Sequence, residues 1–493
     1  MRMWYVCGMA RMPHDRLLVE PLVAQALAGR LDDAQARQLA GRDPELVALT
    51  LLALARRIRD LQAHTPGGVS PSTPSGQRPI YTKPNVAAGR GRRRKRPGAR
   101  DGHPGHHRPP PPRIDEHREH HLKVCPCCGG PLQRCQRSRT RLIEDLPENL
   151  HSVVTEHTIH RDYCPKCKKH VEPVVPDALP NATFGHRLIS FTSWCHYGLG
   201  VTLDQLIDIL QFHLQTKLSA GGLSAAWQRL ADILRPWYEQ LAEEAKKAAY
   251  LHADETGWRV QGQTCWLWCF ANGQVCYYLI DRCRGSPVLQ RFFGEAFDGI
   301  LLHDFWAAYE SIDVADRQYC LVHLLRELEK VDQHNTSPQW QAFAKTLRRL
   351  LRDGIRLRKR PDFTPTRYQS RILRIGRRLD TLIATEPDDA DARRLLKRLR
   401  RTGDHLFTFL DYPAIPFENN CAERMIRPAV ILRKNSQSNR SERGARTQAV
   451  LMSVYRTLHL RGHDPLRTLA EALRTYLQSG QLPPLPAADI ADR

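Results

Sequence analysis

The sequence predicts a multidomain α/β protein, and the main evidence is a change of pattern after residue 249. From there the stretches AYLHAD, CWLWCFANG and QVCYYLID have the composition of strands, and Asn272-Gly273 is a strong two-residue hairpin signal. The helix PVLQRFFGEAF, the strands GILLHD and QYCLV and the helix HLLRELEKV then follow in alternation. Three antiparallel strands followed by alternating helix and strand predict a mixed five-stranded sheet with flanking helices.

Length and charge limit the classes of protein to consider. The chain has 493 residues, too many for one compact core, so we expect two to four domains. Its formal net charge of +22 and pI near 9.7 favour a polyanionic partner, with nucleic acid as the first candidate. No uncharged apolar run reaches transmembrane length, and the first residues lack the apolar core of a secretory signal. We therefore expect a cytoplasmic protein without a membrane partner.

Two CxxC pairs predict a metal site. Cys125-Pro-Cys-Cys128 and Cys164-Pro-Lys-Cys167 each enclose a proline and are separated by 35 residues of strand-like text. Four thiolates in this arrangement suit tetrahedral Zn²⁺, so we predict a structural zinc ribbon with Cys125, Cys128, Cys164 and Cys167 as ligands. Cys127 is an alternative ligand, and unligated cysteines or a redox pair are the competing interpretation. Because all four positions are filled by protein, this zinc would hold a fold and perform no chemistry.

A basic linker precedes the zinc ribbon. Residues 65–113 are rich in Pro, Gly, Ser and Arg with almost no large apolar side chains, so we expect disorder. Within it, seven of the twelve residues in GRGRRRKRPGAR are basic. This run is either a solvated charge run or an arm that follows DNA phosphates and enters a minor groove. The candidate DNA-binding residues are Arg90, Arg92, Arg93, Arg94, Lys95 and Arg96.

Helical periodicity dominates on both sides of the predicted sheet. VTLDQLIDILQFHL, the turn LSAGGLS and AAWQRLADILRPWYEQLAEEAKKA resemble a helix-turn-helix, which is either a DNA reader or plain core. The clusters LRRLLRDGIRLRKR and RRLLKRLRR are either solvated faces or phosphate contacts. We accordingly divide the chain into an N-terminal helical segment (1–64), the linker (65–113), the zinc ribbon (114–180), the helix-turn-helix-like region (181–248), the sheet domain (249–440, with a helical insertion at about 335–405) and a C-terminal helical segment and tail (441–493).

Three acidic residues form the candidate active site. Asp254 ends the first predicted strand, Asp304 ends the fourth, and Glu423 begins a helix in FENNCAERMIRP. The first and fourth strands of a mixed sheet can be neighbours, and a helix packed on the sheet could add the glutamate. Converging carboxylates repel one another unless divalent cations neutralise them, and Mg²⁺ prefers carboxylate oxygens. Alternatively, the three are a turn residue, a helix cap and a member of a capping box. Glu255, on the opposite strand face, is not assigned as a ligand.

At these residues the sequence resembles the IS66 family of bacterial insertion-sequence transposases. HADETGW resembles the family's first-Asp strand, and HDFWAAY resembles the second, with Asp304 five residues before Tyr309. CLVHLLRE resembles a Cys-x-x-His-x-x-Arg segment, and ENNCAERMIRPAVILRKN resembles the Asn-Asn-x-x-Glu-Arg block that supplies Glu423. Phe305 stands where many members have Gly, and Glu418 where Asp often precedes the Asn pair. The resemblance implies an RNase H-like fold with an Asp-Asp-Glu active site.

The resemblance also implies a function. We expect Mg²⁺-dependent cleavage of the element's terminal inverted repeats and strand transfer into target DNA, with two ions at the active site and Mn²⁺ able to substitute. The expected partners are double-stranded DNA, further copies of the chain on DNA, and accessory proteins encoded by the element. Supporting residues are Asn420, Arg424, Arg427 and His323, the last of these also consistent with a core histidine. A catalytically inactive DNA-binding protein and a structure-specific nuclease are the rival functions.

Overall fold

The chain forms two compact units. The computed structural model describes residues 33–41, 47, 50, 51, 54, 111–122, 124–132, 140–144, 146–147, 150–360 and 364–488. Unit 1 comprises Met1–Ile80, Leu302–Ala307 and Asp316–Asn419, and unit 2 comprises Tyr81–Leu301, Ala308–Ala315 and Asn420–Arg493. Of the helices predicted near the N-terminus, the described part includes α3 (Asp33–Ala40), while the basic run at 89–100 lies outside the described residues.

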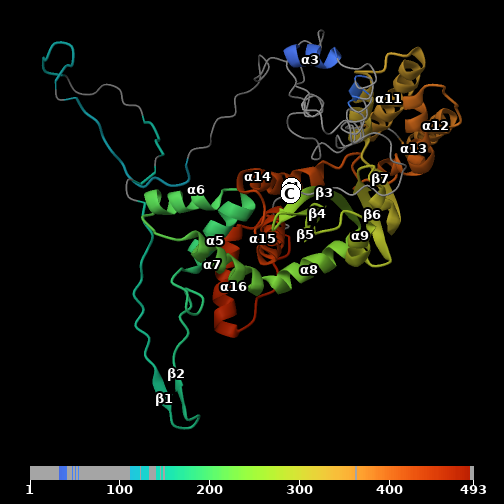
Figure 1. The fold of residues 1–493 in the computed structure, drawn as a ribbon. Coiled ribbons are helices and arrows are strands. Elements are labelled where there is room, and N and C mark those ends of the chain that lie inside the picture. The colour runs from blue at the N-terminus through green and yellow to red at the C-terminus, as the bar shows by residue number, and fades with distance from the viewer. Residues whose placement is uncertain are drawn as a thin grey trace. The chain divides into compact units, whose positions relative to one another are not determined.

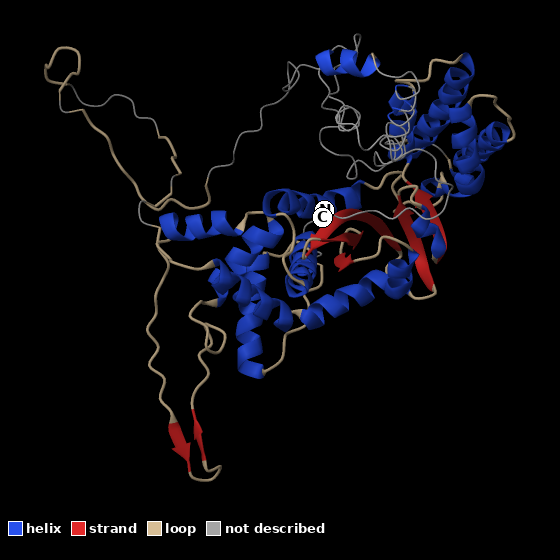
Figure 2. Ribbon diagram, in the orientation of Figure 1, coloured by secondary structure: helices blue, strands red, loops and turns tan. Residues whose placement is uncertain are grey.

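A five-stranded sheet is the central element of the fold, and it confirms the sequence-based prediction. Its strand order is β5-β4-β3-β6-β7. The strands are β3 (Tyr250–Val260), β4 (Gln263–Ala271), β5 (Cys276–Asp281), β6 (Ala296–His303) and β7 (Asp313–Tyr319). The first three form an antiparallel meander, visible in Figure 2. The predicted hairpin turn at Asn272 is also correct, because its N–H donates to the Val275 carbonyl at 2.9 Å.

Several predicted boundaries were wrong by a few residues. The stretch Asp-Glu-Thr-Gly at 254–257 has the composition of a turn, yet β3 continues through it to Val260 because β4 pairs with it along its whole length. The reversal instead occurs at Gln261 and Gly262, whose φ angles are 52° and 74°. The helix α9 (Ser286–Phe293) is shorter than predicted, because Gly294, with φ 81°, ends it and the following residues join β6.

The helix α15 (Glu442–Leu460) covers β5, the edge strand of the meander in unit 2. It packs against β5 and against α7 (Ala220–Ile233) and α8 (Arg235–Lys246), as Figure 1 shows. Two backbone N–H groups of β5 donate to its hydroxyls, that of Cys276 to Thr457 Oγ1 at 3.1 Å and that of Tyr278 to Ser453 Oγ at 2.9 Å. Side chains of α15 thereby satisfy donors that an edge strand would otherwise present to another chain.

The helices within the helix-turn-helix-like region begin and end at different residues from those predicted. The region contains α5 (His186–Ser193), α6 (Leu203–Asp208) with a wider helical turn at Ile209–His213, and then α7 and α8. The Gly-Gly pair falls inside the first turn of α7 rather than between helices, because Ser219 caps that helix by accepting from Gly222 N. The predicted single long helix divides at Leu234, next to Pro236 at the start of α8. Trp227 and Trp237 are buried, so these helices contribute core.

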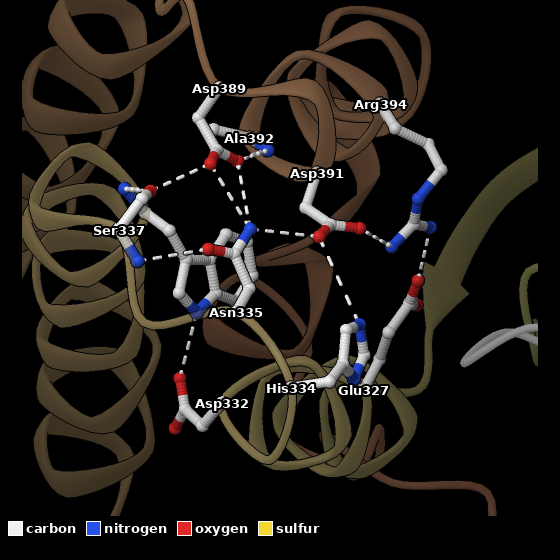
Figure 3. Close-up of polar contacts among 10 residues, drawn as sticks. Glu327, Asp332, His334, Asn335, Ser337, Asp389, Asp391, Ala392 and Arg394 are labelled. Atoms are coloured by element: carbon white, nitrogen blue, oxygen red, sulfur yellow. Dashed lines mark hydrogen bonds and ion pairs between the residues drawn. The ribbon is translucent and has the colours of Figure 1, made fainter.

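The helical insertion belongs to unit 1. It comprises α11 (Pro338–Arg358), α12 (Pro365–Ile383) and α13 (Ala390–Thr402), which pack together in Figure 1. The helix α10 (Leu321–Val331), which precedes the insertion, packs on α11. A polar cluster joins the α10–α11 connection to the start of α13 (Figure 3). There Asn335 Nδ2 donates to both Asp389 and Asp391, and Ser337 Oγ donates to Asp389 at 2.7 Å. Burial alone would raise the pKa of Asp389, but the N–H of Ala392 and these side-chain donors outweigh it and hold that pKa below its ordinary value.

Candidate active site

Asp254 lies in the interior of β3 rather than at its end, which corrects the sequence-based prediction. It is paired across the sheet with Cys269 of β4, and one of its carboxylate oxygens, Oδ1, accepts the N–H of Glu255 at 2.9 Å. Hydrogen bonding on both sides fixes the backbone of a central strand, so the carboxylate projects from a rigid element. The residue is half-buried.

Glu255 joins two segments that lie far from it in the sequence. Its side chain is 2% exposed and accepts from Arg284 Nη2 at 2.8 Å and from the Tyr309 hydroxyl at 2.6 Å. The Arg284 guanidinium also lies over the Trp266 ring, 4.5 Å from its centroid. The residue after Asp254 is therefore hydrogen-bonded to the residue five positions after Asp304. This contact gives a physical reason for Glu and Tyr in the two motifs.

Asp304 follows β6 directly and accepts a local backbone hydrogen bond. Its Oδ1 takes the N–H of Trp306 at 2.8 Å, which holds the carboxylate in a tight turn. The preceding His303 is fully buried, and burial lowers its pKa to about 3. Its neutral ring therefore donates through Nδ1 to the Asp304 carbonyl at 2.5 Å. This bond and the turn together restrict the backbone on both sides of the acid.

Phe305, the position where the sequence departs from the family pattern, is held within unit 1. The Phe305 ring stacks on the Tyr319 ring, with 4.9 Å between the two centroids. Its other partner is the guanidinium of Arg398, a residue of α13, which lies 4.6 Å from the centroid of the Phe305 ring. Arg398 and Arg394 in turn both donate to Glu327, whose side chain is 4% exposed. The aromatic ring therefore connects the turn that carries Asp304 to the helical insertion, a contact that a glycine could not make.

Glu423 lies in the first turn of α14 (Asn420–Ser436). This helix packs on β3 and β4, so the element with Glu423 packs on the strand with Asp254. The Tyr278 hydroxyl donates to the carbonyl of Met425 at 2.6 Å, and Arg433 donates to Thr256 Oγ1 at 3.1 Å. Both ends of α14 are thereby fixed on the sheet.

The predicted supporting residues occupy different environments. Asn420 is the first residue of α14, and its role as a cap stays a prediction. Arg424 and Arg427 are exposed on the same helix, and His323 is half-buried in the first turn of α10. The motif segments CLVHLLRE and ENNCAERMIRPAVILRKN are in contact, since the N–H of Asn419 donates to Cys320 Sγ at 3.2 Å.

The two CxxC knuckles are each formed locally. Cys164 ends β1 (Asp162–Cys164), which pairs with β2 (Lys169–Val171) around the Cys167 turn. Hydrogen bonding from the Cys167 N–H lowers the pKa of Cys164, and the N–H of Cys127 does the same for Cys125. Among the residues that the structure describes, no group of three or more His, Cys, Asp or Glu side chains is arranged to hold a metal ion.

The chemistry of the donor set nevertheless suits the expected ions. Asp254, Asp304 and Glu423 supply carboxylate oxygens, which are the hard donors that Mg²⁺ prefers, while the knuckles supply thiolates, which suit Zn²⁺.

Within the described part of the chain, no helix is both long enough and apolar enough to span a membrane.

Comparison with known proteins identifies the family. The family model described as "Transposase IS66 family" matches residues 181–447, which is more than half of the chain. The uncharacterized protein y4jD of Sinorhizobium fredii is 24% identical over 410 residues, covering 73% of this chain and 76% of that protein. The uncharacterized protein y4hP of the same organism is 22% identical over 408 residues, covering 71% and 70%. The matched segment contains all three candidate acids and the five-stranded sheet, and the chain therefore belongs to the IS66 family of transposases.

Proposed function

We propose that this protein binds the terminal inverted repeats of its own insertion sequence, cleaves the DNA there and joins the freed 3′-hydroxyl to target DNA. The observation that carries the proposal is the family match over residues 181–447, which spans Asp254, Asp304 and Glu423. Two structural observations support it. First, β3, which contains Asp254, and β6, which ends directly before Asp304, are neighbours in the sheet. Second, α14, which contains Glu423, packs on β3.

The three acids are proposed to hold divalent metal ions. Two Mg²⁺ ions, with Mn²⁺ able to substitute, would supply activation of the attacking oxygen and stabilisation of the leaving oxygen. The contribution of the chain is to hold the carboxylates in place. Asp254 is fixed by its central strand, Asp304 by the Trp306 N–H, and Glu423 by a helix packed on the sheet. Such preorganisation matters because small displacements of reacting groups are costly to the rate.

Exposed cations beside Glu423 are proposed to bind substrate. Arg427 lies one helical turn after Glu423, and both it and Arg424 are exposed, so their guanidinium groups could reach a DNA phosphate. His323 is proposed as a supporting residue that orients a neighbouring group. In addition, we propose that Cys125, Cys128, Cys164 and Cys167 bind one structural Zn²⁺ and that the basic arm at 89–100 contacts DNA. At least two copies of the chain are proposed to assemble when two element ends are brought together. Accessory proteins are proposed to join them where the element encodes such proteins.

The test is a strand-transfer assay with purified protein. The substrate is a labelled duplex that carries the element's end, incubated with Mg²⁺ and target DNA. We expect wild type to join DNA, and we expect Asp254→Asn, Asp304→Asn and Glu423→Gln to bind the duplex without reacting. Asp298→Asn is the matched control, because it removes an exposed carboxylate from the same β6 strand that leads to Asp304.

Two outcomes would favour the rival functions. Wild type that binds DNA but never cuts it, with Mn²⁺ and accessory proteins supplied, would indicate an inactive DNA-binding protein. Wild type that cuts without joining would indicate a nuclease on the same fold.

A further inference from the structure

The cations of α11 are divided between two roles. Two of them, Arg348 and Arg358, have structural partners, the Asp332 carboxylate and the Pro413 carbonyl respectively. The others form a row that continues one residue beyond the helix, with spacings of four, three, four and three positions. This basic row consists of Lys345, Arg349, Arg352, Arg356 and Lys359, and all five are exposed. At 1.5 Å per residue, the row extends about 21 Å along one side of the helix.

The basic row is almost free of carboxylates. Asp353 is the single acid of α11; it lies 3.6 Å from Arg356 but is bonded more closely, at 2.9 Å, to Arg378 of α12. No described carboxylate lies within ion-pair distance of Lys345, Arg349 or Arg352. The opposite side of the helix packs into the core of unit 1 through Phe343, Leu347, Leu350 and Leu351, together with other buried residues.

Such a row has a cost in the isolated protein. Like charges four positions apart on a helix repel, and each such pair costs a few tenths of a kcal/mol. The helix dipole offsets this cost only within the last turn, so it accounts for cations at Arg356 and Lys359 but leaves Lys345, Arg349 and Arg352 unexplained. A solvated face does not require cations in register, and several other arginines of unit 1 are paired with carboxylates, as Arg398 is with Glu327 and Arg378 with Asp353.

We propose that the basic row of α11 is a binding surface for the phosphate backbone of duplex DNA. This inference rests on the proposed function in taking DNA as the partner. A duplex carries one negative charge per about 1.7 Å of its axis, so a rod of cations about 21 Å long is matched by phosphates along its whole length. The side chains are long and contact only charge, so the surface holds DNA of any sequence. It would serve target or flanking DNA rather than recognition of the element's ends.

The test is the salt dependence of binding by the full-length protein to a labelled duplex of arbitrary sequence. The variant is Lys345→Gln/Arg349→Gln/Arg352→Gln, which keeps good helix formers at exposed positions. The matched control is Arg235→Gln/Arg467→Gln/Arg474→Gln, which removes the same charge from exposed positions of α8 and α16 (Pro465–Ser479). Circular dichroism and the thermal midpoint verify that both variants fold as wild type does.

The expected result is a weaker affinity and a smaller salt slope for the α11 variant alone. Three lost phosphate contacts reduce the slope of log affinity against log salt by about 2 to 3. A second variant with glutamate at the same three positions should weaken binding further. An α11 variant with the slope of the control would overturn the proposal. A strand-transfer assay distinguishes failure of this inference from failure of the proposed function. If wild type joins DNA but the α11 variant binds DNA as well as the control variant does, the basic row is not a DNA-binding surface and the proposed function stands. If wild type binds no DNA, both proposals are overturned.

Discussion

Removal of the Tyr309 hydroxyl should destabilise the sheet measurably. Tyr309 is fully buried, and its hydroxyl donates at 2.6 Å to Glu255, whose side chain is 2% exposed. Tyr309→Phe keeps the ring and its edge contact with Trp268, so it creates almost no cavity. A hydrogen bond to a charged group contributes about 1.5 to 3 kcal/mol, and a buried carboxylate loses a donor here, so we expect a loss of about 2 kcal/mol.

The assay is a double-mutant cycle followed by denaturant unfolding and amide hydrogen exchange in β3. Tyr309→Phe, Glu255→Gln and the double variant should show a coupling of about 1 to 2 kcal/mol, since the two side chains are in contact. Tyr412→Phe is the control; Tyr412 is 43% exposed, so we expect a change within about 0.5 kcal/mol. If Tyr309→Phe behaved like Tyr412→Phe, or if the cycle showed no coupling, the hydrogen bond would not stabilise the fold and our reasoning would be refuted.

Three further predictions concern other parts of the chain. Glu327→Gln removes the negative charge of a buried side chain that binds Arg398 and Arg394, so we expect the free energy of unfolding to fall by about 3 kcal/mol, measured by thermal denaturation. A thermal midpoint like that of the exposed control Glu329→Gln would contradict this expectation. Burial lowers the pKa of His196 to about 4, so the contribution of this residue to stability is fully present above about pH 6.5 and is lost by about 1.4 kcal/mol per pH unit between there and about pH 4. A urea-unfolding series in which His196→Asn kept the full acid dependence would exclude this cause. Finally, purified protein should contain one zinc ion per chain by elemental analysis, and Cys164→Ser should lose it; metal-free wild type would remove the basis for the zinc ribbon.

The sheet could be predicted from the sequence because local signals agree with tertiary structure there. The Asn272-Gly273 pair marks a turn by backbone preference alone, and the flanking apolar runs are long enough to indicate strands. The length of β3 could not be predicted, because Asp254 and Gly257 are typical of turns and only pairing with β4 keeps them extended. Here a long-range interaction overrides local propensity.

The site could be predicted only in part, for a related reason. Motif spacing identifies the candidate acids, but it contains no information about contacts between distant positions. Glu255 meets Arg284 and Tyr309, which are 29 and 54 positions away, and Glu327 meets Arg398 at 71 positions. Each of these side chains taken alone has the pattern of an ordinary solvated charge or core aromatic. Their partners are determined by packing, so only the folded chain shows them.

The helical insertion returns close to where it leaves. Leu321 N donates to the carbonyl of Phe417 at 2.9 Å, and Gln318 bonds both Leu406 and Phe409, so the stretch between them is a closed excursion. Closing a loop costs only about 0.6 kcal/mol more for each doubling of its length. The 119 positions that separate Asp304 from Glu423 are therefore weakly constrained in number. Insertions or deletions within the excursion should be tolerated, and sequence searches that fix the distance between these acids would miss relatives that searches anchored on its two ends would find.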